Sequence, residues 1–292
     1  MQQANVILGL LAQTSIHAGI GSTTGVIDLP IQREGHNGWP CVFGSAMKGA
    51  LRARAEAQYG EKNDSVKFVF GPDTNNASEH AGALLVSDAR LLLLPVRSLT
   101  SQFKWVTCPA ALKRYHADAE RFGVSVPEFD LPDIKTEAAI VPQQTQYDSL
   151  FLEEYRFDAK AQNLDSLIET LAALMQRDGA EADLQQQLVI VSNDMFAHLS
   201  QHATPVNAHI AIDSDTKTVR SGALWYEETL PPETLLYVGL SANKARTKEA
   251  TMAAKDILGA VTDLFSDKPW LQVGGNETVG MGWCAIKKQG GE

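Results

Sequence analysis

Residues 17–34 read HAGIGSTTGVIDLPIQRE, a segment rich in glycine and proline that predicts a loop or hairpin built around a single acid. That acid, Asp28, lies between Ile27 and Leu29, so its carboxylate is expected to be partly desolvated. A partly buried carboxylate in a glycine-bracketed loop is a candidate functional group. The structural alternative is an acid that caps the turn before Pro30.

The sequence GSAMKGALR follows at 44–52 and predicts the start of a helix with Ser45 as its N-cap. Unpaired N–H groups and the positive end of the helix dipole favour a phosphate at such a start. Lys48 and Arg52 are four residues apart and share one face of the helix, where they add positive charge. The alternative is an ordinary capped helix in which Arg52 pairs with Glu56.

A second glycine-rich run, GGNETVGMG, occupies residues 274–282. Glycines allow the backbone to approach a ligand closely and expose N–H groups to phosphate. A dinucleotide-binding loop would open a helix, and no helix is predicted after this run. The remaining interpretations are a phosphate-binding loop and a tight β-turn.

Strand and helix patterns alternate along the chain without internal repeats. We predict an opening strand over 6–15, a helix over 45–59, paired strands over 83–86 and 90–96, a helix capped by Thr107, a helix over 164–177, a strand over 188–191, a helix capped by Ser192, a β-hairpin over 207–226, a strand over 235–240, a helix over 247–265 and two strands around the glycine run. Short strands interleaved with pairs of helices favour an α+β fold with a ferredoxin-like (RRM-like) core over a doubly wound parallel sheet.

The 292-residue chain carries 25 Lys and Arg against 35 Asp and Glu, a formal net charge of -10. Nucleic-acid-binding proteins usually have a basic balance, so local charge has to supply any such binding here. Between 118 and 158 ten acids stand against three bases, whereas residues 33–54 contain four bases and one acid. An acidic segment can therefore coexist with a basic groove.

Three cysteines, Cys41, Cys108 and Cys284, lie far apart without the spacing of a zinc or redox site, which indicates a reduced compartment. No apolar run approaches the roughly 18 residues of a membrane span. The first residues are typical of a strand and not of a signal peptide. We therefore expect a cytoplasmic protein that does not enter the membrane.

The first two segments together resemble the backbone subunit of type III-B (Cmr) CRISPR effector complexes, a member of the RAMP superfamily of RNA-binding proteins. The His-Ala-Gly-Ile-Gly motif that begins at His17 matches this family, and residues 274–282 resemble its C-terminal glycine-rich loop, which sits beside the bound guide RNA. The family usually has a second hydroxyl and a leucine where Ala46 and Met47 stand here. The resemblance covers roughly 6–60, 84–116, 190–240 and 270–286, and it is weakest over 123–163.

The resemblance implies a single RAMP domain over 1–292, with a ferredoxin-like core, an acidic helical or loop insertion at 123–163 and a long β-hairpin thumb at 203–228. In the family the thumb reaches over a neighbouring subunit and pushes one nucleotide out of the guide–target duplex at regular intervals. Its return strand usually ends Tyr-Glu-Glu-Tyr, where this chain has Tyr226-Glu227-Glu228-Thr229.

The implied activity is that of a metal-dependent endoribonuclease that cleaves target RNA by attack of the RNA's own 2′-hydroxyl. Asp28 is the catalytic candidate, either as the acceptor of the 2′-hydroxyl proton or as a ligand of weakly bound Mg²⁺ or Mn²⁺. A free aspartate has a pKa of about 3.9 and is a poor base at neutral pH, so metal assistance suits it better. His17 is a second catalytic candidate, and Glu227 is a further one at the thumb. The residues expected to bind RNA are Ser45, Lys48, Arg52, Arg33, Gly274, Gly275, Asn276, Thr278 and Gly280.

The implied partners are a CRISPR guide RNA, a complementary single-stranded target RNA, further copies of the chain in a head-to-tail helical array, and other Cmr subunits. Two alternatives stay open. One is a guide-binding scaffold subunit that does not cut RNA, and the other is an unrelated enzyme that binds a nucleotide at 274–282. His198 and His202 are expected to have ordinary surface or core roles because no third metal ligand is in view.

Overall fold

A computed structural model describes residues 3–61, 63–72, 81–129, 131–246 and 252–291. Its central strand is β1 (Ala4–Ala12), whose residues from position 6 to 12 are all buried. β1 runs antiparallel between β12 (Leu235–Ala242) and β14 (Trp283–Gln289). An unbroken apolar strand is expected where helices cover both faces of a sheet, since side chains on each face then lie in a core.

The described residues form a 12-stranded mixed sheet in the order β13-β14-β1-β12-β4-β5-β9-β6-β8-β7, with β2 pairing β4 and β3 pairing β12. Its β5–β9 and β6–β8 pairs are parallel and its other pairs are antiparallel. The remaining strands are β2 (Cys41–Val42), β3 (Leu84–Val86), β4 (Ala89–Ser98), β5 (Ser101–Thr107), β6 (Ala138–Pro142), β7 (Ser149–Leu152), β8 (Tyr155–Gln162), β9 (Leu188–Ile190) and β13 (Trp270–Gln272).

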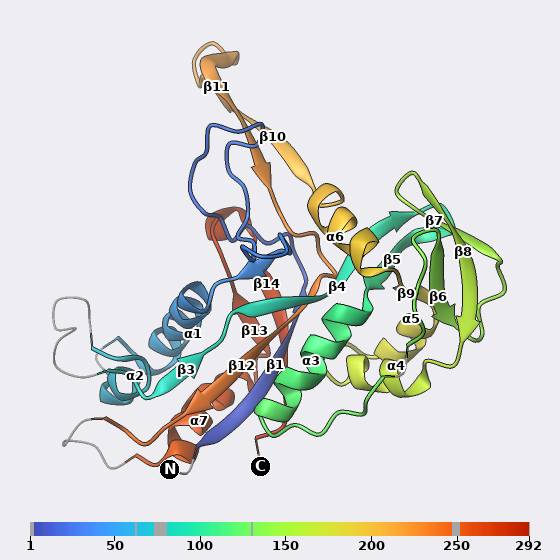
Figure 1. Cartoon of the computed structure of the whole chain (residues 1–292). Helices are drawn as coiled ribbons and strands as arrows, with labels where there is room; N and C mark the ends of the chain where they lie inside the picture. Colours follow the sequence, from blue (N-terminus) through green and yellow to red (C-terminus); the bar gives the residue numbers. More distant parts are fainter. Residues whose placement is uncertain (1–2, 62, 73–80, 130, 247–251, 292) are drawn as a thin grey trace.

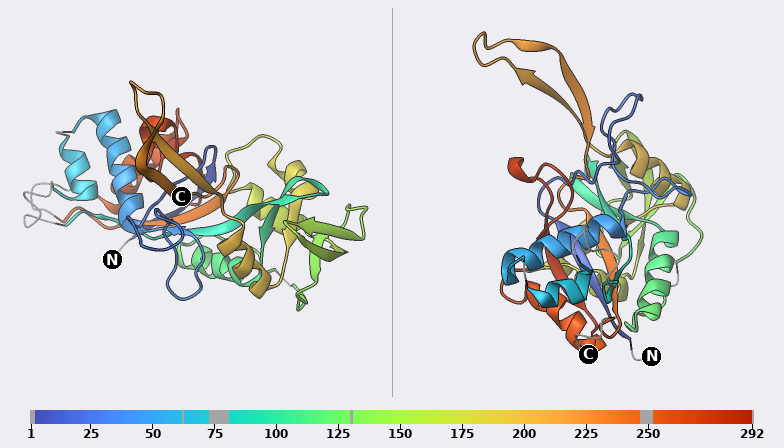
Figure 2. Two further views of the ribbon diagram at one scale, coloured as in Figure 1. Left: turned by 90° about the horizontal axis from the view of Figure 1, so that it is seen from above. Right: turned by 90° about the vertical axis from the view of Figure 1, so that its left-hand side faces the viewer.

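Helices cover both faces of this sheet, which separates two hydrophobic cores (Figures 1 and 2). One core receives apolar side chains of α1 (Gly44–Tyr59), α2 (Asp64–Phe70), α6 (Asn193–His202) and α7 (Ala254–Thr262), followed by the 3₁₀ turn η2 (Asp263–Phe265). The other core receives α3 (Pro109–Arg121), α4 (Asp165–Ala172) and α5 (Ala180–Gln187). The chain is therefore a mixed α+β protein, as predicted, while a ferredoxin-like core within it stays a prediction.

A two-stranded hairpin stands apart from the large sheet and projects from the body of the molecule (Figures 1 and 2). Its strands are β10 (Val206–Ile212) and β11 (Val219–Glu228), which pair in antiparallel register. The hairpin predicted from alternating residues is thus present, and α6 before it is capped by Ser192, as expected.

The start of α1 differs from the prediction in its capping. Phe43 holds the N-cap position and makes no side-chain capping bond, so Ser45 lies in the first turn. A Cβ at Gly44 would come within 2.7 Å of the Val86 carbonyl oxygen, which shows how closely this turn packs on the sheet. Gly60 ends the helix with a φ of 92°, as predicted.

Two further local predictions are wrong. β3 and β4 do not pair with each other, because both align along β12 with a break at residues 87–88. Thr107 does not cap α3, since Cys108 occupies the N-cap and the Thr107 hydroxyl is buried without a partner. In both places tertiary packing overrides a local signal.

The acidic segment 123–163 was expected to form loops or helices, and it supplies β6, β7 and β8, which extend the large sheet. The helix predicted over 164–177 ends at Ala172, and α5 follows as a separate helix. The helix predicted over 247–265 is present as α7 and η2, and residues 247–251 lie outside the described residues.

Cys41, Cys108 and Cys284 are all buried and unpaired, as their spacing suggested. Among the helices of the described residues, none has both the length and the apolar character needed to cross a membrane.

Gly9 provides a test of the packing around β1. A Cβ there would lie 2.0 Å from the backbone oxygen of Leu174, so Gly9→Ala has to push two backbone segments apart. We expect a loss of about 1–3 kcal/mol in the free energy of unfolding, measured in urea. Gly259→Ala in α7 is the matched control, because nothing lies within 4 Å of its Cβ and alanine favours a helix. Equal losses in both variants would contradict this account.

Candidate functional site

The glycine-rich loop 17–34 lies against the end of β11 at the base of the hairpin (Figures 1 and 2). Leu29 forms a parallel bridge with Glu227: its N–H donates to the Tyr226 oxygen at 3.0 Å, and its own oxygen accepts from Glu228 N at 3.0 Å. Ile16 forms a second bridge, with Leu230. The chain is therefore held by β11 at Leu29 and, just before the loop, by the residues that follow β11.

Asp28 is half-buried in this loop. The backbone N–H of Tyr226 donates to its Oδ2 at 2.7 Å, so the carboxylate is fixed to β11 and does not cap the turn before Pro30. Its other oxygen, Oδ1, accepts no hydrogen bond from a described residue. One side of the carboxylate is thus held in place, and the other is available to a ligand.

His17 is buried next to β11, the strand whose Tyr226 N–H holds the Asp28 carboxylate. Its Nδ1 lies 2.8 Å from the Glu228 carbonyl oxygen, and since a carbonyl can only accept, Nδ1 carries the hydrogen of this bond. In the neutral ring Nε2 is then the nitrogen that accepts a hydrogen bond. A Cβ at Gly19 would come within 2.5 Å of Nε2, so a side chain at that position would collide with the ring.

The glycine run 274–282 packs directly on His17. The Gly275 N–H donates to the His17 oxygen at 2.8 Å, and a Cβ at Gly274 would lie 2.4 Å from the same oxygen. Asn276 donates from Nδ2 to Glu227 Oε1 at 2.5 Å. Thr278 lies in the 3₁₀ turn η3 (Glu277–Val279) and Gly280 directly follows this turn. Both residues are exposed. Strand β14 follows instead of a helix, so the dinucleotide interpretation lacks its structural context.

Glu228 and Arg33 form the buried ion pair that joins these segments. Glu228 Oε1 accepts from Arg33 and from the Thr204 hydroxyl at 2.7 Å, and its Oε2 accepts from Ile31 N at 3.1 Å. Arg33 also donates to the oxygens of Gly38 and Ser200. The guanidinium predicted to bind RNA is thus engaged within the protein, and its RNA-binding role stays a prediction.

Sequence reasoning missed the structural roles of Glu228 and Gln32. Gln32 is buried, donates from Nε2 to the Gly19 oxygen at 3.1 Å and accepts the Phe43 N–H at 2.6 Å. It therefore links the Asp28 loop to the residue that precedes α1. A polar residue among apolar neighbours was the available signal, as it was for Asp28.

The residues at the start of α1 that were predicted to bind RNA differ in whether other protein groups already engage them. Gly44 N donates to Asp88 Oδ1 at 2.7 Å, so a carboxylate already lies at this helix terminus. Arg52 pairs with Glu56 at 2.7 Å, which is the ordinary-helix alternative. Burial lowers the pKa of Lys48, and the charges of Arg246 and Arg52 lower it further. Lys48 is therefore part of a small basic cluster, with Ser45 exposed nearby on the same turn.

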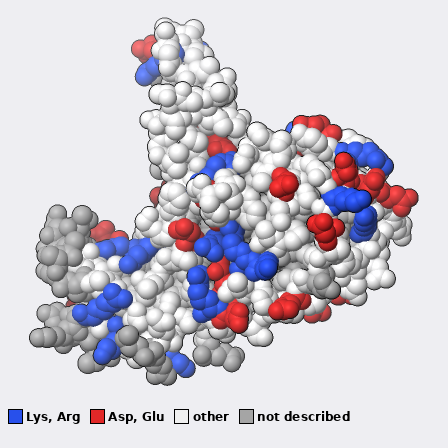
Figure 3. Space-filling view, viewed as in Figure 1, with Lys and Arg blue, Asp and Glu red and all other residues white. Residues whose placement is uncertain are grey.

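The visible face in Figure 3 has Lys and Arg side chains gathered near α1 and α2 and again near its centre, mixed with acids. The shaft of the hairpin is almost free of charge, with both signs at its tip (Figure 3). Exposed apolar residues line this shaft: Val206, Ile210, Ile212, Val219, Leu224 and Tyr226.

Within the described ranges, no group of three or more His, Cys, Asp or Glu side chains is placed to hold a metal ion. Mg²⁺ commonly binds through one or two protein carboxylates together with water and phosphate oxygens. The unengaged Oδ1 of Asp28 fits one such carboxylate ligand and does not form a closed metal site by itself.

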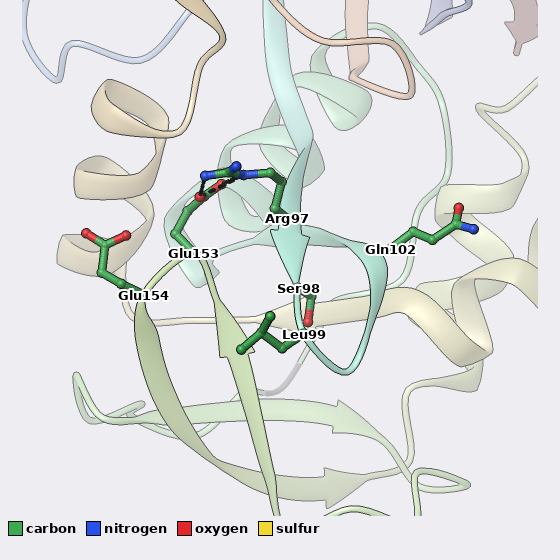
Figure 4. Close-up of a pocket in the computed structure, with 6 residues that line it drawn as sticks. All are labelled: Arg97, Ser98, Leu99, Gln102, Glu153 and Glu154. Atoms are coloured by element: carbon green, nitrogen blue, oxygen red, sulfur yellow. Dashed lines mark hydrogen bonds and ion pairs between the residues drawn. The ribbon is translucent and has the colours of Figure 1, made fainter.

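A surface hollow lies away from all of these residues, between the β4–β5 turn and the β7–β8 turn (Figure 4). Arg97 and Glu153 form an ion pair at its edge, beside the exposed side chain of Leu99. None of the predicted site residues lines it. The candidate site is thus the open surface at the base of the hairpin and not this hollow.

Comparison with known proteins gives consistent matches. The RAMP superfamily matches residues 10–285. The chain is 35% identical over 284 residues to the CRISPR system Cmr endoribonuclease Cmr4 of Pyrococcus furiosus, covering 96% of this chain and 94% of that protein. The crystal structure of oligomeric Cmr4 from Pyrococcus furiosus superposes with a TM-score of 0.75 and 26% identity, covering 99% and 98% of the two chains. A chain of the type III-B Cmr-beta complex bound to cognate target RNA has the same fold, with a TM-score of 0.72 and 21% identity over 99% and 97% of the chains.

The Arg33–Glu228 pair can be tested by removing its carboxylate. Glu228→Ala leaves a guanidinium, a hydroxyl and an amide without their common acceptor, so we expect a loss of about 3–5 kcal/mol in the free energy of unfolding. Glu56→Ala is the matched control, because it breaks a more exposed Arg–Glu pair and should cost no more than about 1 kcal/mol. Urea unfolding measures both, and similar losses would show that Glu228 does not hold the site together.

Proposed function

Because the chain belongs to the RAMP superfamily, we propose that it is the backbone subunit of a type III-B Cmr CRISPR effector complex and that it cleaves target RNA. The observation that carries the proposal is the meeting of the Asp28 loop, His17 and the glycine run at the end of β11. These segments come from the two ends of the chain, and they leave one oxygen of the Asp28 carboxylate without a hydrogen bond from a described residue.

Guide RNA binding is proposed along the glycine run and the start of α1. Gly274, Gly275 and Gly280 are exposed and carry no side chain, so RNA can approach the backbone of this loop closely, and Asn276 is held against Glu227, which fixes the shape of the loop. At α1, Ser45 and Lys48 are better placed than Arg52, whose guanidinium is shared with Glu56 and the Gly71 carbonyl. Pairing between guide and target supplies sequence recognition, and the protein contacts the backbone.

In the proposed reaction the 2′-oxygen of the target bonds to the adjacent phosphorus while the P–O5′ bond breaks. The products are a 2′,3′-cyclic phosphate and a 5′-hydroxyl. Asp28 Oδ1 accepts the 2′-hydroxyl proton or orients that hydroxyl, and the Tyr226 N–H holds Oδ2 so that the carboxylate cannot rotate away. His17 Nε2 provides a second group that can exchange a proton, held in one orientation by the Glu228 carbonyl.

In the metal-assisted alternative, Asp28 would instead hold a weakly bound Mg²⁺ or Mn²⁺, which would stabilise the negative charge that develops on the phosphate. The protein's own contribution is the position of the carboxylate, fixed by a backbone N–H of β11.

The β10–β11 hairpin is proposed as the thumb of this subunit. A two-stranded ribbon is marginally stable alone, and its apolar side chains, such as Ile210, Leu224 and Tyr226, are exposed in the single chain. Contact with an adjacent copy and with RNA bases would cover them. Such a contact joins two different surfaces and so propagates head to tail along the guide, together with other Cmr subunits.

The scaffold alternative keeps guide binding and lacks cleavage. The 35% identity to a relative named an endoribonuclease argues against it, and the unengaged Oδ1 of Asp28 is compatible with cleavage.

Asp28→Asn separates cleavage from binding. Asparagine keeps an oxygen for the Tyr226 N–H but loses the negative charge, so target cleavage should fall by about 10²- to 10⁴-fold while guide retention persists. Cleavage is measured on a complementary target RNA with the assembled complex, and retention by the length and amount of bound RNA. Asp148→Asn, an exposed acid on the 123–163 segment, is the matched control. Undiminished cleavage by the Asp28 variant would exclude this residue as the catalytic group.

Shortening the hairpin tests the thumb. Ile212 and Val219 pair across the ribbon, so replacing residues 213–218 with Asn-Gly closes it by a two-residue turn and retains the register. We expect the variant to fold and bind guide RNA but to lose most regularly spaced target cleavage. An unchanged cleavage pattern, or a native complex with only one copy of the chain, would contradict the proposed head-to-tail array.

A further inference from the structure

A polar pocket of about 350 Å³ lies between the start of β5, the loop after β6 and the C-terminal end of α5. Five glutamines, two threonines and a serine line it, together with Lys104 and Tyr147. It shares no residue with the proposed RNA-binding surface or with the hollow in Figure 4. Its composition is unusual for a cavity, because nearly every lining side chain offers a hydrogen bond.

Lys104 is the only cation among the residues that line this pocket, and its side chain is almost completely buried, with 3% of its surface exposed. Nζ donates to the Gln186 carbonyl oxygen at 2.8 Å and lies 5.3 Å from the centroid of the Tyr147 ring. These contacts use one of the three N–H donors of the ammonium. No ion pair joins Lys104 to a carboxylate of the described chain.

An ammonium that is largely removed from water and has no counter-charge is destabilised, because one carbonyl and an aromatic ring replace only part of its lost hydration. Burial accordingly lowers the pKa of Lys104, and no neighbouring acid raises it again. A bound negative charge would remove this penalty.

Gln187 supplies the second observation. Its Oε1 is buried and has no hydrogen-bond partner among the described residues. An unsatisfied buried acceptor also carries a desolvation cost. Among the residues that line the pocket, Lys104 thus lacks a counter-charge and Gln187 lacks a hydrogen-bond donor within the described chain.

We propose that this pocket binds the side-chain carboxylate of an aspartate or glutamate from a partner protein, with Lys104 as its counter-charge. One carboxylate balances one ammonium, and the two unused Lys104 donors match its two oxygens. An RNA phosphodiester suits the pocket less well, because it carries a nucleotide on each side and would have to reach a single buried cation.

The test uses the full chain and N-acetylglutamate N-methylamide, which presents a carboxylate beside two amide N–H groups. At constant ionic strength this probe should raise the Tm by about 3 °C when its concentration is ten times its dissociation constant. The matching glutamine derivative, which lacks the charge, should have no effect. Lys104→Gln should abolish the shift, and Lys160→Gln, an exposed lysine on β8, should retain it.

Lys104→Met distinguishes lost binding from lost folding. Replacing an uncompensated buried charge by an apolar side chain of similar length should leave the Tm of the protein without probe unchanged or raised. A marked fall would show that the ammonium holds the fold through Gln186 and Tyr147, which would overturn the proposal.

Three other results would also overturn it. A Tm shift that persists in Lys104→Gln would place binding elsewhere. If potassium acetate raised the Tm as strongly as N-acetylglutamate N-methylamide, the ligand of the pocket would be a free small carboxylate and not a protein side chain. If the dinucleotide UpU raised the Tm and N-acetylglutamate N-methylamide did not, the ligand of the pocket would be RNA.

Discussion

The ion pair between Arg33 and Glu228 is the interaction on which the arrangement of the candidate site depends. It joins residues that are 195 positions apart, and both partners also bind backbone groups around them. A buried pair of this kind is stable only while all of its partners are present, since loss of one leaves the other charge uncompensated. The position of loop 17–34 on β11, and with it the position of Asp28, follows from this pair.

Three close backbone approaches complete the site around His17. Gly19 leaves room for the imidazole ring, Gly274 lets the C-terminal loop reach the His17 carbonyl, and Gly275 donates a hydrogen bond to it. A side chain at Gly19 or Gly274 would separate the elements that the site brings together. These glycines therefore allow the two loops to pack closely against each other as well as to approach a ligand. This packing explains why two glycine-rich runs occur at opposite ends of the chain.

The hairpin extends this arrangement outward. β11 supplies the N–H that fixes Asp28 and then the exposed apolar shaft that we assign to contact with a neighbouring copy and RNA. In this proposal a movement of the hairpin on assembly would change the position of the Asp28 carboxylate directly, because the N–H that holds this carboxylate belongs to hairpin strand β11. Position in the array and readiness to cleave would then be linked by backbone hydrogen bonds and not by a separate switch.

Local patterns in the sequence determined the α+β class, the buried strand β1, the end of α1 at Gly60, the cap at Ser192 and the β10–β11 hairpin, because each depends on residues within a few positions of one another. Local patterns also marked Asp28 and the glycine run as separate candidates, and the resemblance to a known family added His17; the functional roles of these residues stay predictions. Only the tertiary structure decided that Arg33 serves Glu228, that Asp88 occupies the start of α1, that segment 123–163 forms sheet strands and that Lys104 is buried without an acid. These facts depend on contacts between residues far apart in the chain, whose energies are set by burial and by the partners available after folding, and no local pattern records which partner a charged side chain will meet.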